Sequence, residues 1–189
     1  MVKDFILASS SPQRKALLAQ INMLPFKIEP ADIDETPKKE EKATAYVKRM
    51  ALEKAKNVFD KNIGKVVLAC DTIIVAKSKI IQKAHNDEEQ KQVMKLLSGN
   101  AHKVLSAVCV INADGKSSVR VNSTKIIMKK LSDEEINDYV LSKEWVGCAG
   151  YKIEGSLSGF VRKIIGSYSG VVGLPLYETR NLLNGAGIK

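Results

Sequence analysis

The pattern of hydrophobic and polar residues along the chain predicts alternating groups of strands and helices. Short apolar runs predict strands over residues 5–8, 26–31, 66–75, 103–111, 119–128, 151–154 and 160–165. Apolar positions at helical spacing predict a helix that begins at Pro12 and further helices over 42–59, 87–97, 132–141 and 176–184. The two kinds of element do not alternate strictly, so the order indicates a mixed α/β protein rather than a doubly wound sheet.

Three serines stand between the first predicted strand and the first predicted helix. Ser11 suits the N-cap and Pro12 the first helical position. The N-terminus of a helix attracts anions, and Ser9, Ser10 and Arg14 add donors beside it. The stretch favours a phosphate-binding loop, although the same residues could simply cap a helix and solvate a loop.

Asp71 interrupts the almost continuous apolar run over 66–75. Burying an ionised carboxylate costs several kcal/mol, as an order of magnitude, unless it is paired, metal-bound or part of a site. We therefore predict that the strand opens onto a cleft at Asp71. The alternatives are an ion pair with a core Lys or Arg, or a strand that ends at Cys70.

Other charged residues could act with Asp71. Glu35, in the acidic loop 32–37, could help Asp71 to hold a divalent cation, because hard cations prefer oxygen ligands. Lys54 on an apolar helix face and Lys83 after a short apolar run could each reach phosphate oxygens, or could snorkel at the edge of the core.

A glycine-rich segment lies near the C-terminal third of the chain. Gly147, Gly150 and Gly155 bracket Cys148 and Glu154. Glycines let a backbone approach a ligand closely, so this segment could contact the edge of a nucleobase, although the same glycines could only form turns.

Composition narrows the class of protein. The 189 residues are 44% apolar, which favours one domain over residues 1–189. No apolar run is long enough to span a bilayer, and the three cysteines indicate reduced thiols, so we expect a cytoplasmic protein. The net charge of +9 suits an anionic partner, but the scattered basic residues and the 5% aromatic content do not favour nucleic acid.

Taken together, these residues resemble the Maf family of nucleotide pyrophosphatases. The motifs that carry the resemblance run in order over nearly the whole chain, at residues 8–14, 34–37, 52–55, 71–72, 83, 97–104, 131–136, 149–151, 166–169 and 173–176.

The resemblance implies an elongated mixed α/β sheet flanked by helices, with two lobes, a central cleft, a relation to inosine triphosphatases and a homodimer. It also implies hydrolysis of a nucleoside triphosphate to a monophosphate and pyrophosphate with Mg²⁺, Mn²⁺ or Co²⁺. Asp71 corresponds to the general base and Glu35 to a residue that supports metal or water. We expect Asp71, Glu35 and Lys83 to be catalytic, the first two to be metal ligands, and the substrate to contact Ser9, Ser11, Gln13, Arg14, Lys54, Thr72 and Glu154.

The resemblance gives a mixed indication of base preference. Members that prefer dTTP and UTP carry Arg, Thr, Lys and Gln where this chain has Gln13, Thr72, Cys148 and Glu154, so only Thr72 agrees. Cys148 and Glu154 look more like the branch that prefers 7-methyl-GTP, but that branch has Gln in place of Thr72. Because a carboxylate only accepts hydrogen bonds, Glu154 favours a guanine-type base. An alternative function is a non-catalytic nucleotide- or nucleic-acid-binding regulator of septum formation.

Overall fold

A seven-stranded mixed sheet forms the centre of the protein, in a computed structural model that describes residues 2–189. The strand order is β2-β1-β3-β5-β6-β7, and β4 pairs with β3. The strands are β1 (Val2–Leu7), β2 (Leu24–Ile28), β3 (Val66–Ala76), β4 (Lys79–Ile81), β5 (Ala101–Ile111), β6 (Ser117–Met128) and β7 (Val161–Ile165). Strand β1 is parallel to β2 and β3, and the other pairs are antiparallel.

Six α-helices and one short 3₁₀ helix flank the sheet in the described part of the chain. They are α1 (Pro12–Gln20), α2 (Ala43–Phe59), α3 (Asp87–Leu97), α4 (Asp133–Leu141), η1 (Ser156–Phe160), α5 (Tyr168–Val172) and α6 (Leu176–Gly185). The mixed α/β fold predicted from the sequence is confirmed. None of these helices is long and apolar enough to cross a membrane.

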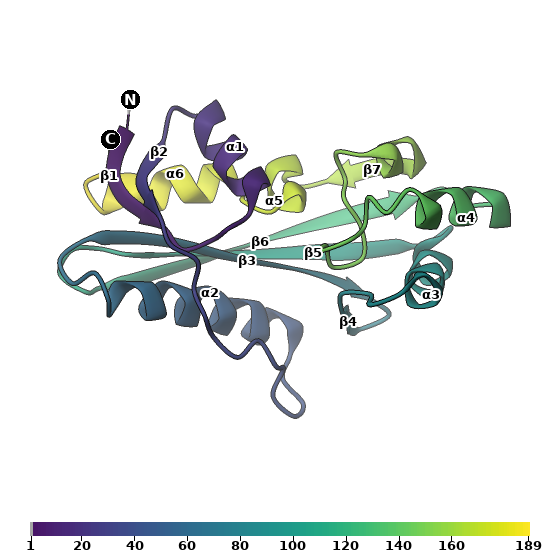
Figure 1. Cartoon of the computed structure of the whole chain (residues 1–189), viewed down its shortest axis with the longest axis horizontal. Helices are drawn as coiled ribbons and strands as arrows, with labels where there is room; N and C mark the ends of the chain where they lie inside the picture. Colours follow the sequence, from purple (N-terminus) through teal and green to yellow (C-terminus); the bar gives the residue numbers. More distant parts are fainter. Residues whose placement is uncertain (1) are drawn as a thin grey trace.

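The long strands β3, β5 and β6 run along the molecule and connect its two ends (Figure 1). At one end α2 covers one face of the sheet, while α1 and α6 lie on the opposite face (Figure 1). Helices α3 and α4 lie at the other end (Figure 1). Three apolar clusters match this arrangement: one under α2, one under α1 and α6, and one around α3 and α4. The shape is elongated, as expected.

Capping explains where two of the helices begin. The Ser11 hydroxyl accepts a hydrogen bond from the Arg14 amide at the start of α1. Ser132 and Glu135 form a complete capping box at the start of α4. Both beginnings were predicted from the sequence, because an N-cap side chain satisfies amide groups that a helix cannot.

Two of the predicted strands differ from the structure. The strand expected over 26–31 ends at Ile28, and Pro30, which has no N–H to donate, follows shortly after. The strand expected over 151–154 is wrong, because this segment is irregular and leads into η1. Tyr151 and Ile153 are both buried, which produces the alternation of a strand, but they pack into the apolar cluster around α3 and α4. The short elements β4, α5 and η1 were not predicted.

The edge of β3 that faces β1 is open in its middle. Strand β1 pairs with β3 only as far as Leu7 opposite Leu68, and β4 begins to pair with β3 at Ile74 opposite Ile81. Residues 69–73 therefore have no strand neighbour on this side, whereas the other edge of β3 pairs with β5 from Val67 to Val75. The gap lies between the ends of two strands, β1 and β4.

Candidate functional site

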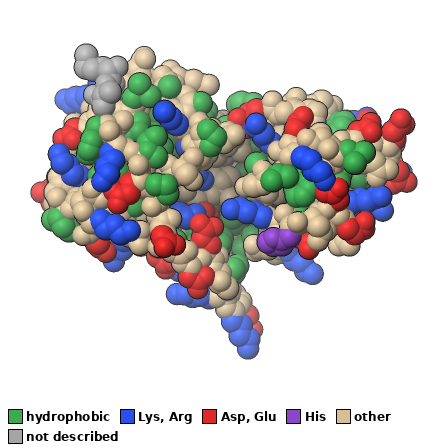
Figure 2. Space-filling model, viewed as in Figure 1, with side chains coloured by type: hydrophobic (Ala, Val, Ile, Leu, Met, Phe, Trp, Pro, Cys, Tyr) green, Lys and Arg blue, Asp and Glu red, His purple; other side chains and the backbone are tan. Residues whose placement is uncertain are grey.

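A cavity of about 580 Å³ lies at this gap. It corresponds to the hollow between the two halves of the molecule in Figure 2. Strand β1 leads directly into the serine loop on one side, and β4 leads to Lys83 on the other. All the predicted site residues line this one cavity: Ser9, Ser11, Gln13, Arg14, Glu35, Lys54, Asp71, Thr72, Lys83 and Glu154.

Lys54 lies between two carboxylates at the floor of the cavity. Its Nζ is 2.7 Å from Asp71 Oδ1 and 2.9 Å from Glu35 Oε1. Lys54 and Asp71 are 9% and 6% exposed, so their attraction is only weakly screened by water. Asp71 Oδ2 is also buried and has no hydrogen-bond partner among the described residues. Asp71 therefore faces a cleft and pairs with a core lysine, and both interpretations of this residue hold.

Helix α2 holds Glu35 and its loop in place. The Tyr46 hydroxyl of α2 donates a hydrogen bond to the Glu35 carbonyl at 2.8 Å. Arg49, one turn later, donates to both carboxylate oxygens of Glu41 and to the Thr36 carbonyl. These contacts tie the acidic loop to the same helix that carries Lys54.

The positive side chains around the cavity keep Glu35 ionised. Burial alone would raise the pKa of the Glu35 carboxyl, but the hydrogen bond and charge of Lys54 hold this pKa below its ordinary value. The charges of Lys83 and Arg14 act in the same direction. Glu35 is thus a carboxylate at neutral pH.

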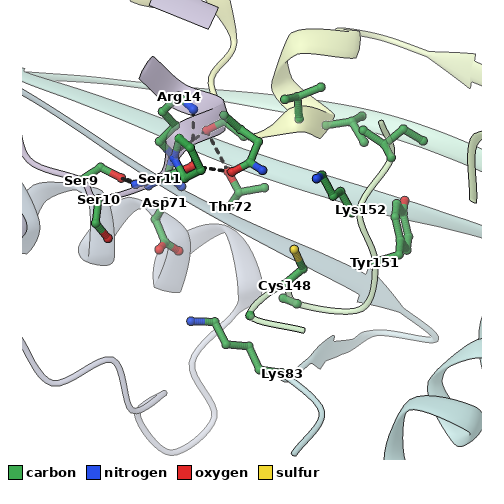
Figure 3. Close-up of a pocket in the computed structure, with 18 of the residues that line it drawn as sticks. Ser9, Ser10, Ser11, Arg14, Asp71, Thr72, Lys83, Cys148, Tyr151 and Lys152 are labelled. Carbon is green, nitrogen blue, oxygen red and sulfur yellow. Dashed lines mark hydrogen bonds between the residues drawn. The ribbon is translucent and has the colours of Figure 1, made fainter. Parts of the chain in front are cut away.

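The serine loop is ordered by its own hydroxyls. The Ser9 hydroxyl accepts hydrogen bonds from the Ser11 amide at 3.2 Å and from Arg14 Nη1 at 3.0 Å. The Ser11 hydroxyl donates to Gln13 Oε1 at 3.2 Å. Ser9 is almost buried and Ser10 is exposed, so the loop presents one fixed and one free hydroxyl beside the start of α1 (Figure 3).

Three donors converge on the carbonyl of Gly173, which follows α5. Arg14 Nε lies at 2.9 Å, Cys70 Sγ at 3.1 Å and Thr72 Oγ1 at 3.3 Å. The Thr72 hydroxyl also bonds to the hydroxyl of Ser106 on β5, at 2.9 Å. The sequence analysis assigned no role to Ser106 or to the Gly173 carbonyl. A single serine in a strand belongs to no motif, and a backbone acceptor leaves no signal in the residue types.

The far wall of the cavity is the loop 147–154. Cys148, Tyr151, Lys152 and Glu154 line it, and the Lys152 side chain extends towards Thr72 (Figure 3). Gly147 and Gly150 have φ values of +81° and +80°, so the turn interpretation of these glycines is correct. Sequence reasoning placed Tyr151 in a strand and missed Lys152, which has no motif of its own.

A buried histidine supports this wall from behind. His102 of β5 is 3% exposed, and its Nε2 forms a 2.7 Å hydrogen bond with the Tyr151 hydroxyl. Burial lowers the pKa of His102 from 6.5 to about 4, so the imidazole is neutral at physiological pH. Burial likewise raises the pKa of Tyr151.

The residues present suit a divalent cation only if a substrate completes the site. No group of three or more His, Cys, Asp or Glu side chains that could hold a metal occurs within residues 2–189. Asp71 Oδ2 has no partner, and Glu35 offers a second carboxylate. Mg²⁺ is commonly held by one or two carboxylates together with substrate phosphates, so this donor set fits the ion.

We predict that Lys54→Met lowers the free energy of unfolding by about 3 kcal/mol, because it leaves the buried Asp71 charge without its partner. Urea denaturation measures this loss. In the double variant Lys54→Met/Asp71→Asn, no charge remains buried at this place, so much of the loss is recovered. Additive losses from the two substitutions would contradict the ion-pair interpretation.

We also predict that His102 makes the fold sensitive to acid. The pKa of His102 is about 4 in the folded state against 6.5 ordinarily, so the unfolded chain binds a proton more readily between these values. Stability attributable to His102 is therefore complete above about pH 6.5 and is lost as the pH falls towards 4. Between about pH 7 and pH 4.5 the wild type should lose about 2 kcal/mol more than His102→Gln. Equal losses in urea titrations would show that another group is responsible.

Proteins similar to this chain occur among solved structures and among named sequences. Among solved structures, the Ham1 protein from Staphylococcus aureus has a TM-score of 0.47 and 14% identity, with 66% of this chain and 71% of that chain covered. The dTTP/UTP pyrophosphatase of Zymomonas mobilis subsp. mobilis is 48% identical over 99% of this chain and 93% of that protein. The protein of the same name from Caulobacter vibrioides is 46% identical, over 97% of this chain and 96% of that protein. A family model described as Maf-like protein matches residues 4–186, and the chain belongs to the Maf family.

Proposed function

We propose that this protein is a nucleoside triphosphate pyrophosphatase. It would use water to cleave the bond between the α- and β-phosphates, releasing a nucleoside monophosphate and pyrophosphate. The observation that carries the proposal is the buried Asp71, which lines one cavity with Arg14, Lys54 and Lys83 and whose Oδ2 has no hydrogen-bond partner among the described residues. The names of the relatives, which are pyrophosphatases of nucleoside triphosphates, support the same reaction.

The triphosphate would bind at the serine-loop end of the cavity. The N-terminus of α1 and the hydroxyls beside it favour an anion, and Arg14 is already fixed by Ser9 and the Gly173 carbonyl. Lys83 stands on the opposite side of the gap and is exposed, so its ammonium is free to reach a phosphate oxygen. These groups would neutralise the charge that develops on the phosphates during attack.

Asp71 would orient and deprotonate the attacking water. Its Oδ1 is engaged by Lys54 at 2.7 Å, which fixes the carboxylate and leaves Oδ2 as the acceptor for the proton. Lys54 also contacts Glu35, so one ammonium sets the positions of both carboxylates. The proton on the water thus has a defined acceptor, and the leaving pyrophosphate has cations beside it.

A divalent cation, Mg²⁺, Mn²⁺ or Co²⁺, would be held by Asp71 and Glu35 together with substrate phosphates. When bound, such an ion neutralises phosphate charge and polarises the phosphoryl oxygens. Arg14, Lys54 and Lys83 carry three positive charges against the two of Glu35 and Asp71, so the protein by itself offers this end of the cavity a surplus of only one. One surplus positive charge does not neutralise a triphosphate, so an additional cation suits this end of the cavity.

The base would lie at the other end of the cavity, where Val104, Tyr151 and Ile153 provide apolar walls for its faces. The relatives' names and the presence of Thr72 favour dTTP and UTP. The presence of Glu154 in the lining favours a second candidate, a guanine-type base such as 7-methylguanine, which offers donors to a carboxylate. A single domain over residues 1–189 and a homodimer also belong to this proposal.

We predict that Asp71→Asn lowers turnover by roughly 10²- to 10⁴-fold, because the variant lacks the proton acceptor. The assay incubates ordinary and modified nucleoside triphosphates with Mg²⁺, Mn²⁺ or Co²⁺ and separates monophosphate and pyrophosphate by chromatography. Asp4→Asn is the matched control, since Asp4 is an exposed carboxylate on β1 and should not affect turnover.

The same assay also tests the proposed reaction. Release of orthophosphate instead of pyrophosphate would exclude the proposed bond cleavage. A folded wild-type protein that hydrolyses none of the nucleotides would favour the alternative of a non-catalytic binding regulator.

We predict that Glu154→Gln shifts the ratio of kcat/KM values towards dTTP and UTP and away from guanine triphosphates. Glutamine both donates and accepts, and so suits a pyrimidine edge that has one N–H between two carbonyls. The gain of one hydrogen bond corresponds to a change of about fivefold in this ratio. An unchanged ratio would exclude Glu154 as a determinant of base preference.

A further inference from the structure

The loop 147–154 is held from behind by three polar side chains on three different elements. Gln90 of α3 donates to the Gly150 carbonyl at 2.6 Å. His102 of β5 shares a hydrogen bond with the Tyr151 hydroxyl, and the Tyr139 hydroxyl of α4 accepts one from the Lys152 amide at 3.3 Å. Three consecutive loop residues are therefore each fixed by a separate element.

These three side chains lie outside the cavity lining and inside the core. Gln90, His102 and Tyr139 are 0%, 3% and 2% exposed. Gln90 Oε1 and His102 Nδ1 have no hydrogen-bond partner among the described residues. Each atom therefore loses its hydrogen bonds to water on folding and gains none in the protein, which destabilises the fold. Apolar side chains of similar volume would avoid this cost, so stability alone does not explain polar residues here.

The front of the same loop faces the proposed base. Cys148, Lys152 and Glu154 line the cavity, and Lys152 extends towards Thr72 (Figure 3). The loop backbone also packs tightly on β3, because a Cβ at Gly150 would lie 2.8 Å from Ile74 Cδ1. A displacement of this backbone would move the hydrogen-bonding groups of Lys152 and Glu154 relative to Thr72.

We propose that Gln90, His102 and Tyr139 are positioning residues that fix the loop 147–154 and thereby set the base selectivity of the site. This inference rests on the proposed pyrophosphatase function. None of the three touches the nucleotide; each acts through the loop residue that it holds.

The first test measures selectivity in Gln90→Leu, His102→Leu and Tyr139→Phe. Each substitution removes one hydrogen bond to the loop, and the ratio of kcat/KM values between dTTP and GTP should move towards unity by about fivefold. The change should lie mainly in KM, since the phosphate end of the cavity is untouched. Thr179→Val is the matched control, because Thr179 of α6 is fully buried and donates to the carbonyl of Pro175, the N-cap of that helix, at the end of the molecule away from α3 and α4 (Figure 1).

The second test does not need turnover. Cys148 is half-buried in the loop, whereas Cys70 and Cys109 are fully buried, so a thiol reagent should label Cys148 first in the native protein. The three variants should label several-fold faster than the wild type and the Thr179→Val control. We then compare how much dTTP and GTP each slow the labelling of Cys148. This comparison measures binding selectivity even in a protein that hydrolyses neither nucleotide.

The two tests separate failure of this inference from failure of the proposed function. Absence of hydrolysis by the wild type would reject the pyrophosphatase proposal, and the labelling and protection experiments would still decide the role of the three residues. If folded variants keep the wild-type labelling rate and the wild-type selectivity, the inference is wrong. Tyr139→Phe, which removes a single oxygen atom, keeps the test decisive if the other two variants unfold.

Discussion

The contact of Lys54 with Asp71 and Glu35 is the interaction on which the rest of the site depends. A carboxylate inside a strand is tolerated only with a partner, and α2 supplies that partner from the adjacent face of the sheet. The same ammonium draws in the acidic loop through Glu35, and Tyr46 and Arg49 of that helix hold the loop there. One helix therefore carries the ammonium that contacts both carboxylates and also holds the loop that carries Glu35.

The topology of the sheet explains why the site lies where it does. Pairing of β1 with β3 ends at Leu68, and pairing of β4 with β3 begins at Ile74. The segments that extend β1 and β4 therefore turn away from β3 on either side of Asp71. Each departing segment carries donors, with the serine loop at one side and Lys83 at the other. A binding site at the interruption of a strand edge needs no separate domain, because the ends of neighbouring strands supply its walls.

The sequence predicted local structure well where it depends on local chemistry. Capping by Ser11 and Ser132, the helix that carries Lys54 and the buried strand around Asp71 follow from spacing and residue type. The segment 151–154 was misjudged because Tyr151 and Ile153 alternate like a strand but are buried by distant helices. Residue chemistry suggested that Glu35 and Lys83 could act with Asp71, and the resemblance to the Maf family implied that all three belong to one site. The contacts of Gln90 and Tyr139 with the loop 147–154 depend on tertiary packing and could not be predicted from the sequence.

The open edge of β3 has a consequence for solubility. Exposed backbone groups beside an apolar strand offer a template for pairing with another chain, and proteins protect such edges with inward-pointing charges. Apart from Asp71 and Thr72, residues 66–75 form an apolar β-prone segment. The carboxylate proposed to act on water is thus also the only charge in this β-prone segment, so it opposes pairing of the segment with another chain when the protein unfolds.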